Sequence, residues 1–367
     1  MCRVAVFCED LLLGGTVLVC GLAQPGLLEV PTNAAQKVPR TVETSGLELV
    51  TPETQQSIDR GLEYLAQRQH DDGSFGSGRR YQRNVAVTAL CGMAFLSAGH
   101  TPGRGKYGRG VQKTIKFIVS RTMPNGFIVD DSSKSQGPMY GHGFATLFLA
   151  EVYGMSRRKE LRPALEKAVR LIVNTQNKEG GWRYNPEPKE ADISVTVCQI
   201  MSLRAARNCG IYVPKNTIDK CIEYVKRSQN SDGGFAYQLT RQAESLFPRS
   251  AAGVVALYSA GIYEGREIER GLSYLNRHLP RGDLFRRVEN HYYYGHYYAV
   301  QAMWHAGESH WRRWYPAVRD ELLLRQRRQG SRATGAWIDT SYSNEYATAM
   351  ACLILQMPNN YLPIFQR

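Results

Sequence analysis

Apolar residues recur at alternating intervals of four and three positions in six segments of the chain. The sets are Ile58/Leu62/Leu65, Val111/Ile115/Ile118, Leu165/Val169/Ile172, Ile218/Ile222/Val225, Ile268/Leu272/Leu275 and the shorter Val318/Leu322. This spacing places apolar side chains on one stripe of an α-helix. The first members of successive sets are 53, 54, 53, 50 and 50 residues apart, so the pattern predicts one helical unit repeated six times.

A second kind of segment follows each striped one and is apolar on most of its faces. These segments are 85–98, 143–153, 194–206, 251–260, 297–306 and 346–356. Helices without a polar face are buried, so the striped helices are expected outside and the apolar ones inside. The sequence therefore predicts an all-α fold, an α/α toroid (α6/α6 barrel) of six helical hairpins. Closure of the ring buries both ends of the repeat array, so no polar capping repeats are needed. An open solenoid is the alternative interpretation.

Glycine-rich turns join the two helices of each unit. The turns contain Gly73-Ser74-Phe75, Gly126-Phe127, Gly180-Gly181-Trp182, Gly233-Gly234-Phe235 and Gly335-Ala336-Trp337, with Arg281–Phe285 in the fifth unit. In three turns a glutamine precedes the glycine by four residues and an aromatic residue follows it by two. These are Gln69/Gly73/Phe75, Gln176/Gly180/Trp182 and Gln229/Gly233/Phe235.

These QW-like turns resemble the Gln–Trp motif of the terpenoid cyclase and protein prenyltransferase superfamily, also called the prenyltransferase/squalene oxidase repeat. The resemblance covers roughly residues 52–357, and the chain looks like the C-terminal half of a squalene-type cyclase. It implies that the glutamine holds helix ends and that the aromatic ring packs on the neighbouring repeat. Because a fold does not determine chemistry, function has to be argued from the site.

The two termini of the pattern divide the chain into three parts. Residues 1–23 carry an apolar stretch, Leu11–Ala23, that is too short to span a bilayer and ends in small residues before Gln24. This is typical of a signal peptide. We therefore expect an exported protein (periplasmic, cell-envelope or secreted), with a linker or arm at 24–50 and one toroid domain at 51–367.

The formal net charge of +13 comes from scattered basic residues and accompanies no recognisable nucleic-acid module. A solvated basic surface explains it, and attraction to anionic lipid or polymer at the envelope or membrane surface is the alternative. We expect no nucleic-acid partner. The sequence contains no phosphate-binding glycine loop, nucleophile elbow or HExxH pattern, so neither a cofactor nor a metal is expected.

The repeat predicts that the N-termini of the inner helices gather on one rim of the barrel. Polar and aromatic side chains at such a mouth are typical of a ligand site. The candidates are Tyr140, His142, Arg249, Tyr294, His296, Glu345 and Tyr346. The alternative is that several of these polar positions only cap helices.

The resemblance suggests two activities that can be checked residue by residue. Zinc-dependent prenyltransferases open one inner helix with an Asp-x-Cys pair, whereas Pro248-Arg249-Ser250 stands here, so a zinc prenyltransferase is not favoured. Squalene-type cyclases carry an Asp-x-Asp-Asp-Thr motif whose middle Asp protonates an alkene. Glu190-Ala191-Asp192-Ile193-Ser194 resembles it, which implies Asp192 as general acid beside Glu190. Ile193 departs from the motif, and a chain of this length lacks the second barrel of those cyclases.

Three functions stay open at this point. The first is a cyclase-like enzyme that binds or cyclises an isoprenoid or another apolar small molecule. The second is a non-catalytic envelope module that binds a ligand or a partner. The third is a glycan-active α6/α6-barrel lyase or hydrolase, which would need an acid–base pair at the rim.

Overall fold

The structure is a computed structural model that describes residues 46–130, 137–156, 158–240, 244–280, 291–330 and 333–366. These residues belong to the unit Thr44–Arg367. The leader at 1–23, nearly all of the arm at 24–50 and the fifth turn at 281–285 lie outside the described residues.

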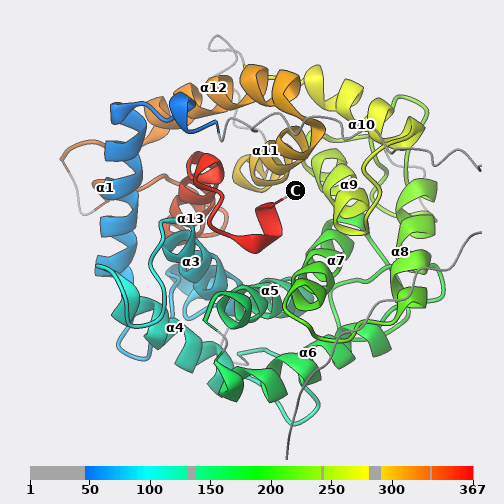
Figure 1. Ribbon diagram of the computed structural model, residues 1–367, viewed down its shortest axis with the longest axis horizontal. Helices are drawn as coiled ribbons and strands as arrows, with labels where there is room; N and C mark the ends of the chain where they lie inside the picture. Colours follow the sequence, from blue (N-terminus) through cyan, green and yellow to red (C-terminus); the bar gives the residue numbers. More distant parts are fainter. Residues whose placement is uncertain are drawn as a thin grey trace, which may run out of the picture. The chain divides into compact units, whose positions relative to one another are not determined.

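In the described part of the chain, twelve long helices form two concentric rings (Figure 1). The outer ring consists of α1 (Pro52–Arg68), α4 (Gly108–Ser120), α6 (Arg162–Asn174), α8 (Lys215–Arg227), α10 (Arg266–Asn276) and α12 (Glu308–Arg325). The inner ring consists of α3 (Val85–Ser97), α5 (Pro138–Ser156), α7 (Ile193–Asn208), α9 (Phe247–Ser259), α11 (Tyr292–Ala306) and α13 (Asn344–Leu355). The short helix α2 (Gly78–Tyr81) and the 3₁₀ turns η1 (Leu47–Leu49), η2 (Lys159–Leu161), η4 (Met357–Asn359) and η5 (Pro363–Phe365) complete the described part. The predicted all-α toroid is confirmed.

The ring is closed, because the last inner helix α13 packs against the first inner helix α3 and against α1. The interpretation as an open solenoid is therefore wrong. The inner helices bury nearly every residue, whereas each outer helix buries one stripe, such as Ile218, Cys221 and Val225 on α8.

The glutamines of the three QW-like turns make the same pair of hydrogen bonds. Each side-chain amide donates to the carbonyl of its own turn glycine and to a carbonyl near the start of the next outer helix. The pairs of acceptors are Gly73 and Gly110 for Gln69 (3.1 and 3.0 Å), Gly180 and Thr217 for Gln176 (2.8 and 2.9 Å), and Gly233 and Glu267 for Gln229 (3.1 and 2.8 Å). One amide thus joins two successive repeats.

A fourth glutamine closes the ring and was missed in the sequence. Gln326 donates to Gly335 of its own turn at 2.9 Å and to Ser57 of α1 at 2.8 Å. Trp337 donates its indole N–H to Leu322 at 2.8 Å, as Trp182 does to Ile172 at 2.7 Å. Gln326 and Gly335 are nine residues apart instead of four, so the longer turn hides the pattern.

The turn glycines set how closely successive repeats approach. Five of them have a left-handed φ of 89° to 102°, and a Cβ atom on any of them would lie 2.1 to 2.5 Å from a main-chain oxygen of the next outer helix. The pairs are Gly73 with Lys113, Gly126 with Lys167, Gly180 with Lys220, Gly233 with Arg270, and Gly335 with Arg60. The last pair again joins the sixth repeat to the first.

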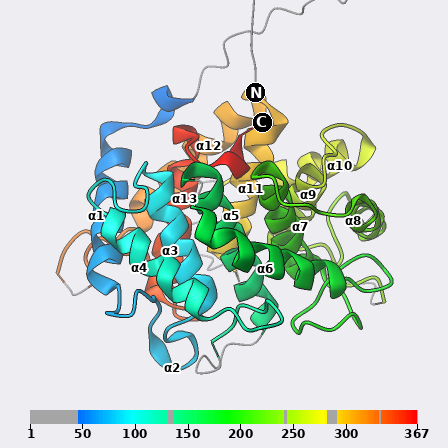
Figure 2. The same ribbon diagram turned by 60° about the horizontal axis from the view of Figure 1, so that its bottom comes forward.

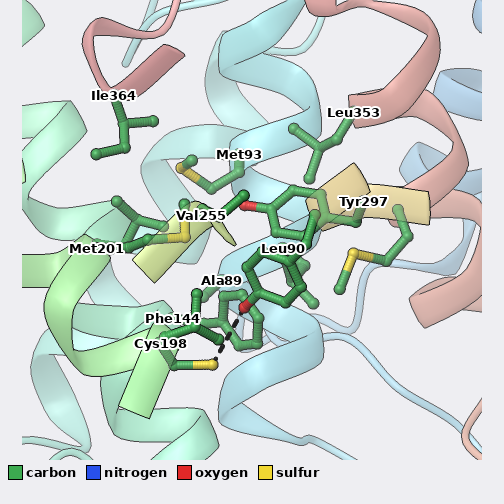
Figure 3. Packing of buried hydrophobic residues seen from close by; sticks show 14 of the residues in the cluster. Ala89, Leu90, Met93, Phe144, Cys198, Met201, Val255, Tyr297, Leu353 and Ile364 are labelled. Atoms are coloured by element: carbon green, nitrogen blue, oxygen red, sulfur yellow. Dashed lines mark hydrogen bonds between the residues drawn. The ribbon is translucent and has the colours of Figure 1, made fainter. Parts of the chain in front are cut away.

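The C-terminal segment occupies one end of the inner ring (Figures 1 and 2). Ile364 and Phe365 are buried, and Ile364 faces the same core as Met93 and Met201 (Figure 3). Trp304 donates its indole N–H to the carbonyl of Phe365 at 2.9 Å. These contacts fall at the C-terminal ends of the inner helices, which leaves the opposite end for a cavity. In the described part of the chain, no helix combines the length and apolar character needed to cross a bilayer.

Gly335→Ala tests the close approach that closes the ring. It should lower the free energy of unfolding by about 2–4 kcal/mol, because a left-handed alanine costs about 1 kcal/mol and overlap with the Arg60 carbonyl adds more. Gly210→Ala is the matched control, since Gly210 has φ 85° and open space around its Cβ position. Denaturant unfolding of both variants measures the difference. Equal losses would show that the contact with Arg60 does not matter.

Candidate functional site

A cavity of about 820 Å³ opens among the N-terminal ends of the inner helices. Its wall is mostly aromatic and aliphatic, and seven tyrosines contribute to it. They are Tyr81, Tyr140, Tyr184, Tyr237, Tyr294, Tyr342 and Tyr346. Phe144 and Phe247 add further rings. The cavity therefore has the apolar lining and the few polar groups of a small-molecule site.

Four of the seven rim candidates line this cavity, namely Tyr140, Arg249, Tyr294 and Tyr346. His142, His296 and Glu345 do not. Burial raises the pKa of the Tyr140, Tyr294 and Tyr346 hydroxyls well above the usual value. These phenols are neutral at physiological pH, so they act as hydrogen-bond groups and ring faces, not as bases.

His142 has a structural role and does not line the cavity. Its Nδ1 accepts the backbone N–H of Ile128 at 3.1 Å, and its Nε2 lies 3.2 Å from the Ala168 carbonyl. A hydroxyl makes the equivalent contact with the turn in four other repeats, through Thr88, Thr196, Ser250 and Thr348. Burial lowers the pKa of His142 to about 4, so the ring is neutral. The interpretation as a mouth residue is corrected.

His296 and Glu345 are also buried in the protein and do not face the cavity. The His296 ring lies among Phe247, Tyr292 and Trp314, and burial lowers its pKa to about 3. Glu345 is buried and pairs with Arg68 of α1 at 3.1 Å, so it is a second link between the last and first repeats.

The predicted pairing of Glu190 with Asp192 is wrong. The Glu190 side chain is 64% exposed and forms an ion pair with Arg183. Asp192 is fully buried, and its Oδ1 accepts the Val195 backbone N–H at 2.9 Å as the N-cap of α7. The guanidinium of Arg183 lies near both carboxylates, since it pairs with Glu190 and its Nε is 3.9 Å from Oδ2 of Asp192, so the two acids share a cation instead of a proton. Glu190 cannot hold the proton of Asp192.

Asp192 has two properties that its role as the N-cap of α7 does not explain. Its Oδ2 has no hydrogen-bond partner, and the nearest cation, Nε of Arg183, is 3.9 Å away. Burial raises its pKa to about 6, against the opposing effects of Ser194, Val195 and Arg183. A fraction of the Asp192 side chains is therefore protonated near neutral pH.

One hydroxyl separates Asp192 from the cavity. Ser194 donates to Oδ1 of Asp192 at 2.6 Å and lies on the cavity wall, while Tyr140 lies 2.6 Å from Ser194 Oγ. Because Ser194 gives its proton to Asp192, Tyr140 donates to Ser194. Read two residues later, Asp192-Ile193-Ser194-Val195-Thr196 also fits the Asp-x-Asp-Asp-Thr pattern at its ends. In that register Ser194, and not an acid, occupies the protonating position.

Several wall residues were not predicted from the inner helices, because they lie in the turns that precede those helices. Tyr184 and Tyr237 each stand two residues after a turn aromatic, in Trp182-x-Tyr184 and Phe235-x-Tyr237, and their hydroxyls meet at 2.5 Å. Asp130 holds the same place after Ile128. This repeated spacing was the available signal. Within the described residues, no three His, Cys, Asp or Glu side chains gather in a metal-binding arrangement.

Two family models match the chain. The squalene-hopene cyclase C-terminal domain matches residues 144–283, and the prenyltransferase alpha-alpha toroid domain matches residues 43–128. Drimenyl diphosphate synthase from Streptomyces showdoensis is 25% identical over 173 residues, which are 47% of this chain and 30% of that protein. This chain therefore spans less than a third of that relative.

Solved structures with the same fold come from different enzymes. The GH76 α-mannanase BT2949 of Bacteroides thetaiotaomicron aligns over 86% of this chain and 98% of its own, with 9% identity and a TM-score of 0.62. A variant of the type II terpene cyclase MstE from Scytonema, in complex with its substrate geranylgeranyl dihydroxybenzoate, aligns over 85% and 98%, with 12% identity and a TM-score of 0.58. At these identities the likeness shows the fold alone.

The two family models, together with the closed ring of helical hairpins, confirm that this chain resembles the terpenoid cyclase and protein prenyltransferase superfamily in sequence and in fold.

Proposed function

We propose that the protein binds an isoprenoid or a similarly apolar small molecule in the tyrosine-lined cavity. The observation that carries the proposal is the wall itself, which joins seven tyrosines with aliphatic residues such as Leu90 and Val129 around about 820 Å³. Burial of apolar surface contributes about 25 cal/mol per Å², so a hydrocarbon chain gains most in such a space.

Five of the seven wall tyrosines use their hydroxyls in hydrogen bonds to other groups of the protein, which leaves their ring faces and edges for a ligand. Tyr184 bonds to Tyr237, Tyr140 to Ser194, and Tyr294 donates to the Ser194 carbonyl at 2.9 Å. Aromatic faces attract positive charge as well as hydrocarbon. The sequence similarity to a drimenyl diphosphate synthase supports an isoprenoid as the ligand class.

Glycan cleavage fits the wall less well, although α-mannanases share the fold. Such enzymes use two carboxyl groups on either side of the scissile bond. Among the described residues of the wall, Asp130 is the one carboxylate, and it forms an ion pair with Arg121 at 2.8 Å.

Acid-initiated cyclisation is a second candidate, favoured by the protonation of Asp192 and its link to the wall. In such a step the hydrogen bond between the two residues would be reversed: a protonated Asp192 would donate to Ser194 Oγ, and Ser194 would give its own proton to an alkene carbon of the ligand as it takes up the proton of Asp192. The C–H bond forms as the Ser194 O–H bond breaks, and the positive charge on the ligand faces the negative Asp192 and the tyrosine rings. The sequence likeness to a cyclase supports this candidate.

Filling the cavity tests the binding proposal. Ala86→Trp places an indole on the wall and should weaken binding of radiolabelled geranylgeraniol at least about tenfold, because the ligand loses apolar contact area. Leu324→Trp is the control, since Leu324 is 69% exposed on α12. Equal affinities in wild type and Ala86→Trp, or no binding to either, would contradict the proposal.

Asp192→Asn and Asp192→Ala separate charge from capping. The pKa of Asp192 is raised from 3.8 to about 6, so the folded state binds the proton more tightly and wild type loses stability as pH rises through this range. Relative to Asp192→Asn, this loss should reach roughly 2 kcal/mol between pH 4 and pH 7, since a shift of one unit is about 1.4 kcal/mol and part of the loss has already occurred at pH 4. Asp192→Ala should in addition lose about 1 kcal/mol at every pH, because alanine does not cap.

Unfolding at several pH values measures these differences, and a difference between wild type and Asp192→Asn that does not change with pH would contradict the buried, titrating acid. Turnover tests the second candidate separately. Conversion of a neutral polyene such as geranylgeraniol should fall as pH rises through about 6 and vanish in Asp192→Asn. Turnover that survives Asp192→Asn would exclude acid catalysis by Asp192.

A further inference from the structure

Glu151 of α5 is a buried acidic side chain that the cavity does not use. It is 1% exposed and does not line the cavity wall. Phe144, seven residues earlier on the same helix, does line the wall, and this interval corresponds to about 10 Å along a helix axis. Glu151 therefore lies toward the other end of the inner ring, where residues 361–366 are docked (Figures 1 and 2).

Side chains from three inner helices hold the main chain of this docked segment. The contacts are the carboxylate of Glu151 with the N–H of Ile364 (3.2 Å), the indole N–H of Trp304 with the carbonyl of Phe365 (2.9 Å), and the guanidinium of Arg204 with the carbonyl of Gln366 (3.1 Å). The side chains of Leu362, Ile364 and Phe365 are buried at the same time. The segment is thus bound both by apolar contact and by polar groups that reach it from α5, α7 and α11.

An apolar layer lies between the docked segment and the cavity. Ile364 faces a layer that contains Met93 and Met201, and Leu90 and Phe144 of the cavity wall lie beyond it (Figure 3). All four of these side chains are buried. Release of residues 361–366 would expose the layer to water, so docking of the segment controls access to the core from this end of the ring.

The charge of Glu151 depends on whether the segment is docked. Burial raises the pKa of this carboxyl from 4.5 to about 8, against the opposing effects of the Ile364 N–H and of Arg204. When the segment leaves, water reaches the carboxyl and its pKa returns toward 4.5, because the effect of burial is lost. At neutral pH, docking of the segment is therefore accompanied by uptake of a proton.

The groups around Glu151 keep their own charge while it titrates. Arg204 of α7 remains a cation. Cys209 at the end of α7 and Tyr297 of α11 interact with Glu151, and burial raises the pKa of both, that of Cys209 to about 11, so they are neutral. Burial also raises the pKa of Cys91 on α3. The ion pairs of α6 and η2, which pack on α5, lie at the surface and are Arg158–Glu160 and Arg162–Glu166.

We infer that residues 361–366 form a pH-sensitive plug, which a protonated Glu151 holds in the ring and which loss of that proton releases. The neutral acid still accepts the Ile364 N–H through its carbonyl oxygen, whereas a buried carboxylate costs free energy that release avoids. The stabilisation of the docked state by the proton is complete below about pH 4.5 and is lost as pH rises to about 8. This device does not depend on the proposed ligand.

Hydrogen exchange of a peptide that covers residues 361–366 measures docking, once each rate is divided by the intrinsic rate at the same pH. From pH 6 to pH 9, the protection of this peptide in the wild-type protein should fall roughly 10- to 100-fold, because the docked state loses one tightly bound proton. A peptide from the middle of α9, such as residues 251–258, should keep its protection, since release of the plug is a local opening.

Glu151→Gln should keep the segment docked and abolish the fall, because its neutral amide oxygen accepts the Ile364 N–H at every pH. Glu160→Gln is the matched control, since it makes the same change at a side chain of η2 that is 61% exposed, and it should show the wild-type fall. Glu151→Leu is a second neutral variant that needs no polar partner. It should weaken docking by the same factor at every pH, so the test does not depend on how well glutamine fits.

Three results would overturn the inference. Constant protection of residues 361–366 in the wild-type protein from pH 6 to pH 9 would show that no proton is coupled to docking. An equal fall in wild type and in the neutral variants of Glu151 would assign the pH dependence to another group, such as His305, which packs on Tyr258 and Tyr263 of the same end. An equal fall in the α9 peptide would mean that the whole ring unfolds and that no separate plug is released.

Discussion

The fold depends on a close contact that each of the five described turns makes with the backbone of the next outer helix. Five turn glycines with left-handed φ lie so near a main-chain oxygen of that helix that a Cβ atom would not fit. The glutamine amides of four of these turns then bond to the same next repeat. Because the contact always points to the following repeat, six copies return to the first one, and Gly335 and Gln326 complete the ring at α1.

Closure decides which polar groups remain for a ligand. It brings the N-termini of the inner helices together, but their first polar side chains are needed by the fold. Asp192 caps α7, His142 accepts a turn N–H, and Glu345 binds α1 through Arg68. What faces the cavity is therefore mostly tyrosine, together with Arg249. The chemistry of the site is therefore set by the side chains that the closed ring does not use for its own contacts.

The sequence predicted the repeat, the two rings and the rim because helical periodicity and turn glycines are local signals. It failed where contacts are long-range. Gln326 was hidden by a longer turn, and the structural role of His142 appears only when its position is compared with the hydroxyls of the other repeats. Glu190 and Asp192 looked like a proton-sharing pair because they are two residues apart, yet one is exposed and the other buried, and Arg183 lies beside both. Tyr184 and Tyr237 reach the cavity from the turns, outside the inner helices whose N-termini predict the rim.

The central claim is that an apolar chain occupies the space between the inner-helix N-termini. Photolabelling with a farnesyl probe that carries a diazirine at its hydrocarbon end, followed by peptide mapping, tests this most directly. The account predicts labels within residues 81–90, 137–144 and 246–249, which supply much of the wall, and competition by unlabelled farnesyl ligands. Labels on the outer faces of helices such as α8, or labels that the competitor does not remove, would contradict it.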